Sequence, residues 1–144
     1  MCIINSVYQK NKLIAKTKRA KRKTIKVWKT LILHDIDGYI TLDSTTYDYV
    51  WNPGLHTKSF KYSIMSIKNG YRMSDEGFYV YLKKPSRSLV YFVYRRIVPF
   101  YANIDDLLAV GCKQWEYENI AVFSKLELKE EDYNKALTEA HCVF

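Results

Sequence analysis

Residues 95–103 bring together side chains of the types that recognise a nucleotide: Arg95, Arg96, Phe100, Tyr101 and Asn103. Guanidinium groups can hold a diphosphate, an aromatic ring can stack on a base, and an asparagine can bind a base edge or a ribose. Because neighbouring side chains in a strand point to opposite faces, only one of the two arginines can face a given ligand. The alternative is that Phe100 belongs to the core and both arginines lie on the surface.

A second aromatic segment, Glu76-Gly77-Phe78-Tyr79-Val80-Tyr81-Leu82, adds Phe78 to the candidate ligand-binding residues. It is faintly similar to the strand with which RNA-recognition motifs stack bases, but it lacks the leading Lys or Arg and the second Gly or Ala. A buried core strand is the stronger interpretation. Gly77 predicts a close approach by a ligand or by a neighbouring backbone.

The positive charge of the chain is concentrated near its start. The whole chain has 23 Lys and Arg and 15 Asp and Glu, but residues 1–30 hold ten of the basic residues and no acid. The other 114 residues therefore hold 13 basic and 15 acidic groups, a net charge of −2. Residues 1–23 are expected to form a basic arm, in which the lysine-rich stretch 16–23 is a solvated linker or a charged edge strand. Its candidate polyanion-binding residues are Lys16, Lys18, Arg19, Lys21, Arg22 and Lys23.

Such an arm attracts phosphates in a salt-dependent, sequence-independent way. It could equally be a solvated arm that aids solubility or covers a partner subunit.

Catalytic and metal-binding patterns are not found in the sequence. His34, His56 and His141 lie far apart, and the three cysteines have no short spacing. We therefore expect no enzyme activity, no metal and no cofactor. No apolar run is long enough to span a bilayer, and no secretory signal is recognisable, so we expect a cytoplasmic protein that does not enter the membrane.

The elements that would position these residues are mostly strands, because aromatic and β-branched residues dominate, with 13 tyrosines in the chain. A helix is expected over Lys129 to His141, where Tyr133, Ala136, Leu137 and Ala140 share one face. The predicted fold is α+β, a mostly antiparallel sheet with one or two helices, over residues 24–144. Predicted strands are 24–34, 39–42, 45–51, 76–82, 95–101, 107–110 and 119–128, with Pro99 at an edge or end; 58–67 and 85–94 stay ambiguous.

Several short segments resemble a loose group of small phage and prophage proteins. They are Met1–Ile4, Lys12–Lys16, Ile25–Lys29, Glu76–Tyr81, Arg96–Tyr101 and Asn119–Leu128. Within that group, the length and the plan of sheet plus helices resemble the first Thoeris anti-defence family. The resemblance implies a phage-encoded protein in the host cytoplasm that sequesters a cyclic ADP-ribose type signal without cleaving it, in pockets formed by a homo-oligomer. The alternative is an inhibitor that binds a nucleic acid or an acidic host protein through the basic arm.

Overall fold

The structure, a computed structural model, describes residues 2–5, 7–44, 49–57, 71–73, 77–85, 94–113 and 119–138. Its elements are β1 (Cys2–Asn5), α1 (Val7–Arg19), β2 (Thr24–Ile36), β3 (Tyr39–Ser44), β4 (Gly54–Thr57), β5 (Tyr71–Met73), β6 (Phe78–Tyr81), β7 (Arg95–Asn103), the 3₁₀ turn η2 (Ile104–Asp106), β8 (Leu107–Lys113), β9 (Asn119–Phe123), β10 (Lys125–Leu128) and α2 (Glu130–Thr138). The predicted α+β fold and its C-terminal amphipathic helix are confirmed.

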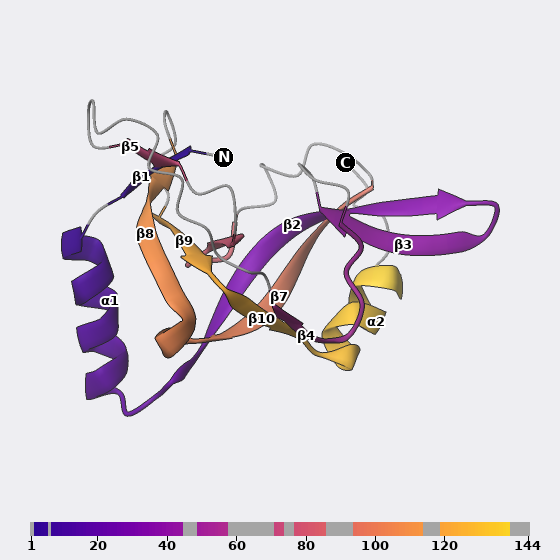
Figure 1. The fold of residues 1–144 in the computed structure, drawn as a ribbon. Helices are drawn as coiled ribbons and strands as arrows, with labels where there is room; N and C mark the ends of the chain where they lie inside the picture. Colours follow the sequence, from indigo (N-terminus) through magenta and orange to yellow (C-terminus); the bar gives the residue numbers. More distant parts are fainter. Residues whose placement is uncertain are drawn as a thin grey trace.

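The strands form one antiparallel sheet in the order β4-β10-β7-β2-β6-β9-β8-β1-β5, and β3 pairs with β2 beside this path. The sheet is strongly bent, as Figure 1 shows. Residues 119–128 pair with strands in both halves of the bend. Strand β9 pairs with β6 and β8. Strand β10, which starts two residues after β9 ends, pairs with β7 and β4. The sequence predicted one strand over 119–128, and the break at Ser124 corrects it.

The core lies inside this bend. Buried and half-exposed side chains alternate along β7, where Val98, Phe100 and Ala102 are buried, and Leu126 and Leu128 alternate with exposed residues on β10. This period of two residues is that of a strand with one buried face. The central strands β6 and β9 are instead buried on both faces. In α2, Ala136 packs into the same core, and three acids fill the first turn, which the helix dipole favours.

The β2–β3 hairpin and β7 hold most of the predicted features. The strand predicted over 39–42 is confirmed as part of β3, and a turn at Asp37-Gly38 joins it to β2. Pro99, expected at a strand edge or end, lies inside β7 opposite Trp28. Strands β7 and β10 pair at Tyr101 and not at Pro99. Because proline has no N–H to donate, its position beyond this pairing costs no hydrogen bond to β10.

The N-terminal segment differs from the expectation. Residues 7–19 form the helix α1, which includes the first part of the stretch 16–23 that was predicted as a linker or a charged edge strand. Strand β1 pairs with β5 and β8 within the sheet. The ambiguous segment 58–67, residues 86–93 and the end of the predicted C-terminal helix lie outside the described residues.

Candidate nucleic-acid interface

The residues predicted to form a nucleotide pocket are separated by the pleat of β7. Phe100 points into the core, where its ring lies 4.9 Å from that of Trp51. The ring of Phe78, from β6, lies 5.0 Å from the same Trp51 ring, and Phe78 is also buried. Neither phenylalanine presents a face to solvent, so neither can stack on a base in this fold. Their aromatic character is explained by core packing.

Arg95 and Arg96 point to opposite faces, as the strand period predicted, but Arg96 is not on the surface. It is 4% exposed, its Nε donates to the Ala136 carbonyl at 3.1 Å, and its Nη1 donates to the Arg95 carbonyl at 3.1 Å. Ala136 lies in the last turn of α2, where backbone carbonyls have no partner within the helix. Arg96 therefore ties α2 to the sheet, and Arg95 is half-exposed on the other face.

The remaining two candidates also have structural contacts. Lys129 Nζ lies 4.0 Å from the ring centroid of Tyr101, which is a cation–π distance. Asn103 caps the turn η2, because its Oδ1 accepts a hydrogen bond from the Asp105 amide at 2.9 Å. The structure thus does not bring the predicted nucleotide-binding set to one place.

The basic residues, by contrast, gather on one element, the exposed flanks of α1 and the turn after it. Along α1, Leu13 packs against the core and Thr17 is buried, so this side of the helix lies against the sheet. The other sides are exposed, and they carry cations. The term basic helix surface is used below for the exposed cations Lys12, Lys16, Lys18, Arg19, Lys21, Arg22 and Lys23.

The end of α1 explains why cations continue past the helix. Lys21 adopts a positive φ of 52°, and its amide donates to the Lys18 carbonyl while the Arg22 amide donates to the Thr17 carbonyl, both at 3.1 Å. This is the Schellman arrangement that ends helices. Lys16, Lys18 and Arg19 fall in the last turn, where the helix dipole favours positive charge.

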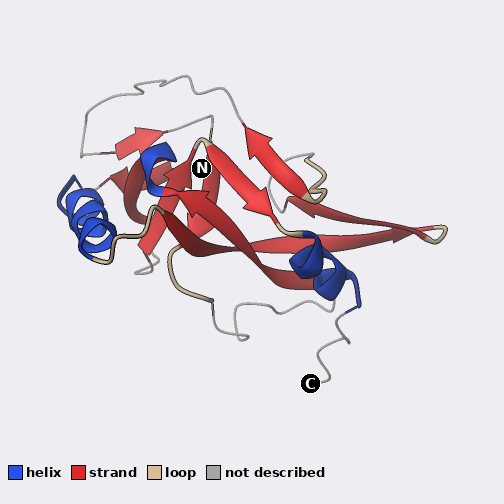
Figure 2. Cartoon of the chain, turned by 90° about the horizontal axis from the view of Figure 1, so that it is seen from below, coloured by secondary structure: helices blue, strands red, loops and turns tan. Residues whose placement is uncertain are grey.

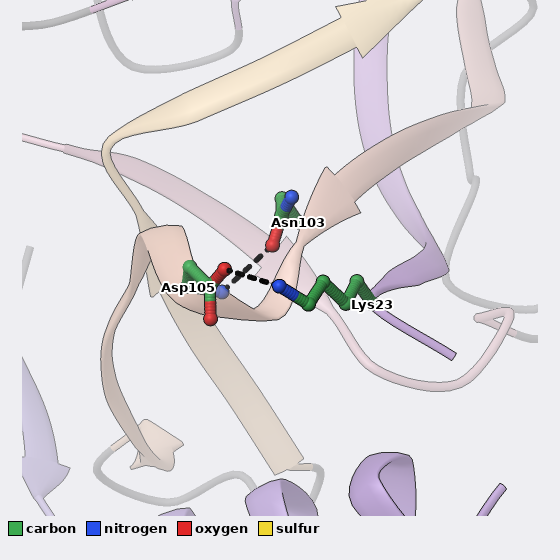
Figure 3. Close-up of polar contacts among 3 residues, drawn as sticks. All are labelled: Lys23, Asn103 and Asp105. Carbon is green, nitrogen blue, oxygen red and sulfur yellow. Dashed lines mark hydrogen bonds and ion pairs between the residues drawn. The ribbon is translucent and has the colours of Figure 1, made fainter. Parts of the chain in front are cut away.

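Acidic groups do little to neutralise this surface within the described residues. Lys23 Nζ lies 3.7 Å from an Asp105 carboxylate oxygen, and both side chains are largely exposed (Figure 3). A solvent-exposed pair of this kind contributes only about 0 to 1 kcal/mol. The basic helix surface therefore keeps nearly all its charge available to a ligand.

Two histidine contacts were not predicted. His34 Nε2, on β2, lies 3.3 Å from an Asp43 carboxylate oxygen on β3. The second contact is made by His56, and the spacing of the aromatic residues over 49–56 did not predict it. Tyr49 Oη is 2.7 Å from His56 Nδ1, and His56 Nε2 is 2.6 Å from the Asn52 carbonyl oxygen.

The Asn52 carbonyl only accepts, so Nε2 of His56 donates to it. With the proton on Nε2, the Nδ1 atom is placed to accept from the Tyr49 hydroxyl. Burial raises the pKa of the Tyr49 phenol above its ordinary value of 10.0. The phenol is thus kept protonated, as a donor that holds the 49–56 segment on the core.

None of the family models, characterised proteins or solved structures compared with this chain matches it. Within the part of the chain that the structure describes, no helix has the length and apolar character to cross a bilayer. Among the same residues, His, Cys, Asp and Glu do not gather in groups of three or more that could hold a metal ion.

Proposed function

We propose that this protein binds nucleic acid, without sequence preference, through the basic helix surface. The observation that carries the proposal is the display of seven exposed cations on a helix and the turn after it, with one face of that helix packed against the sheet. Counterion release from phosphates favours binding to such a cluster at moderate salt.

The composition of the surface favours backbone recognition. Five of its seven cations are lysines, which act as flexible point charges, and two are arginines. Contacts to phosphates fix position and carry no sequence information directly. The anchored helix also reduces the entropy lost on binding relative to an unfolded arm, because its backbone is already ordered.

Sequestration of a small cyclic nucleotide, and a phage counter-defence role, stay predictions from the resemblance. The residues expected to form the nucleotide pocket lie apart, and Phe78, Phe100 and Arg96 are in the core. The basic helix surface supports the alternative stated from the sequence, a module that binds a polyanion.

The test replaces charge and keeps the helix. The variant Lys12→Gln, Lys16→Gln, Lys18→Gln and Arg19→Gln uses a residue of similar helix propensity. At about 0.1 M salt we expect its affinity for a 20-base-pair DNA to fall at least tenfold, roughly, because four of seven phosphate contacts are removed. Fluorescence anisotropy measures the affinity.

The matched control removes the same charge from elsewhere on the molecule. Lys83, Lys84, Lys125 and Lys135 are exposed and lie outside the basic helix surface. Changing all four to Gln should leave most of the affinity intact. Equal losses in the two variants would mean that net charge alone drives binding, and the proposal would fail. Deletion of residues 1–23 is a poorer test, because it also removes β1 from the sheet.

A further inference from the structure

The β2–β3 hairpin projects from the body of the molecule. Its turn is formed by Asp37 and Gly38, both with positive φ, and the Asp35 carboxylate accepts a hydrogen bond from the Gly38 amide at 3.1 Å. These are the backbone angles that suit a two-residue hairpin turn. Figures 1 and 2 show the hairpin extending beyond the rest of the sheet at one end, opposite the end that carries α1.

The tip of this hairpin is both apolar and acidic. Ile36 and Tyr39 pair across the strands and are 68% and 76% exposed, and Ile40 is exposed beside them. Asp35 and Asp37 are exposed at the same tip. No Lys or Arg occurs from residue 30 to residue 57, so no cation of this segment neutralises the two aspartates. Residues 35–40 are called the hairpin tip below.

The opposite end of the molecule has the complementary character. Val7 and Tyr8 of α1 are 62% and 75% exposed, and Ile14 is exposed as well. Tyr8 lies one helical turn from Lys12, and Ile14 lies one turn from Lys18, so apolar and basic side chains are neighbours on the helix. Among the described residues, six of the nine exposed large hydrophobic side chains belong to these two places.

We propose that the hairpin tip of one molecule docks on the α1 surface of a second copy of this chain. Apolar side chains of each would cover the other, and Asp35 and Asp37 would face the cations of the basic helix surface. Because the two places lie at opposite ends of the molecule (Figures 1 and 2), one chain cannot pair them with each other. The contact joins unlike surfaces, so two copies can pair reciprocally as a two-fold dimer, or copies can extend into a ring or a chain.

The contact is independent of the proposed nucleic-acid binding, although both use the basic helix surface. A polyanion and a second copy would therefore compete. The self-association test is made with nuclease-treated full-length protein, whose absorbance spectrum shows no nucleic acid, so a failure of nucleic-acid binding leaves its result unaffected.

The test is charge reversal, read by sedimentation velocity over a range of protein concentrations. Asp35→Lys with Asp37→Lys gives a tip variant, and Lys18→Glu with Arg19→Glu gives a helix variant. The unchanged protein should form larger species as concentration rises, more weakly at about 0.5 M salt, where charges are screened within a few ångströms. Each variant alone should associate at least tenfold more weakly, because the tip variant places like charges opposite each other and the helix variant lowers the positive charge that faces the aspartates from +7 to +3.

Mixing the two variants in equal amounts should restore pairing, because the unchanged hairpin tip of the helix variant then meets the unchanged α1 surface of the tip variant. Restoration also proves that both variants fold. Lys83→Glu with Lys84→Glu makes the same charge change as the helix variant and should behave like the unchanged protein. A protein that stays monomeric at every concentration, or variants that associate as strongly as the unchanged protein, would overturn the proposal.

A milder pair of changes separates docking from protection of a strand edge. Asp35→Asn with Asp37→Asn keeps the turn acceptor and a residue that tolerates positive φ, and removes only charge. The proposal expects weaker association. If the aspartates instead serve to repel other strand edges, this variant would associate more strongly than the unchanged protein, and the proposal would be wrong.

Discussion

Arg96 is a charged side chain in the core, and its guanidinium donates hydrogen bonds to the carbonyls of Ala136 and Arg95. Arg96→Ala should lower the free energy of unfolding by about 2 to 3 kcal/mol, because a charge-assisted hydrogen bond is lost and a helix-end carbonyl is left buried. Urea denaturation measures the change. Arg95→Ala, on the half-exposed face of the same strand, is the control and should lose less. Equal losses would contradict the assigned role of Arg96.

Tyr49 predicts a dependence of stability on high pH. Its pKa is raised in the folded protein by burial, whereas the unfolded phenol ionises near 10.0. The stability that depends on the protonated phenol is thus fully present below pH 10 and is lost as pH rises through the folded pKa. Urea midpoints between about pH 8 and 11 should fall less for Tyr49→Phe than for the unchanged protein. Parallel curves would show that Tyr49 contributes nothing to this loss.

Two glycines allow a matched test of packing at the scale of an element. Gly77 and Gly54 have similar positive φ values, 128° and 124°, but a Cβ at Gly77 would lie 2.6 Å from Val122 Cγ1 whereas one at Gly54 would meet nothing within 4 Å. Gly77→Ala should therefore destabilise the protein by about 1 to 3 kcal/mol more than Gly54→Ala, since only the first adds overpacking to backbone strain. Thermal or urea unfolding measures the loss of stability in each variant. Equal losses would contradict the close approach of Val122 to Gly77.

The elements that sequence patterns predicted are those with a strong local signal. The strands on either side of Asp37-Gly38, the aromatic strand β6, the alternation of β7 and the amphipathic α2 were all expected. Helix α1 was missed because its docked face offers mainly Leu13 and Thr17, a weak apolar stripe in a run dominated by lysines. The bend at Ser124 was missed because it depends on which distant strands β9 and β10 pair with, and no local pattern encodes those partners.

The candidate site also combines features that the sequence predicted with features that depend on the fold. The run of cations was visible in the sequence, but its presentation on a docked helix was not. For the nucleotide set, residue types alone misled: Phe78, Phe100 and Arg96 are suitable for a ligand, and burial assigns them to the core instead. The strand period did predict that Arg95 and Arg96 would separate.

At the scale of the whole molecule, charge is divided between two ends. The first 30 residues carry ten positive charges, and the remainder carries a net charge of −2. The structure places α1 at one end and the acidic hairpin tip at the other (Figure 1). This separation underlies both proposals, because phosphates and the aspartates of a second copy are alternative anions for the same cations.

The dependence of DNA affinity on salt tests the central claim most directly. If the seven cations of the basic helix surface meet phosphates, the logarithm of the binding constant should fall with the logarithm of salt concentration with a slope approaching about −6, since each contact contributes about −0.9. The quadruple Gln variant of α1 should have a slope shallower by about 3 to 4. The quadruple Gln control variant should keep the original slope. A slope near zero for the unchanged protein, or the same slope for the α1 variant, would contradict the account.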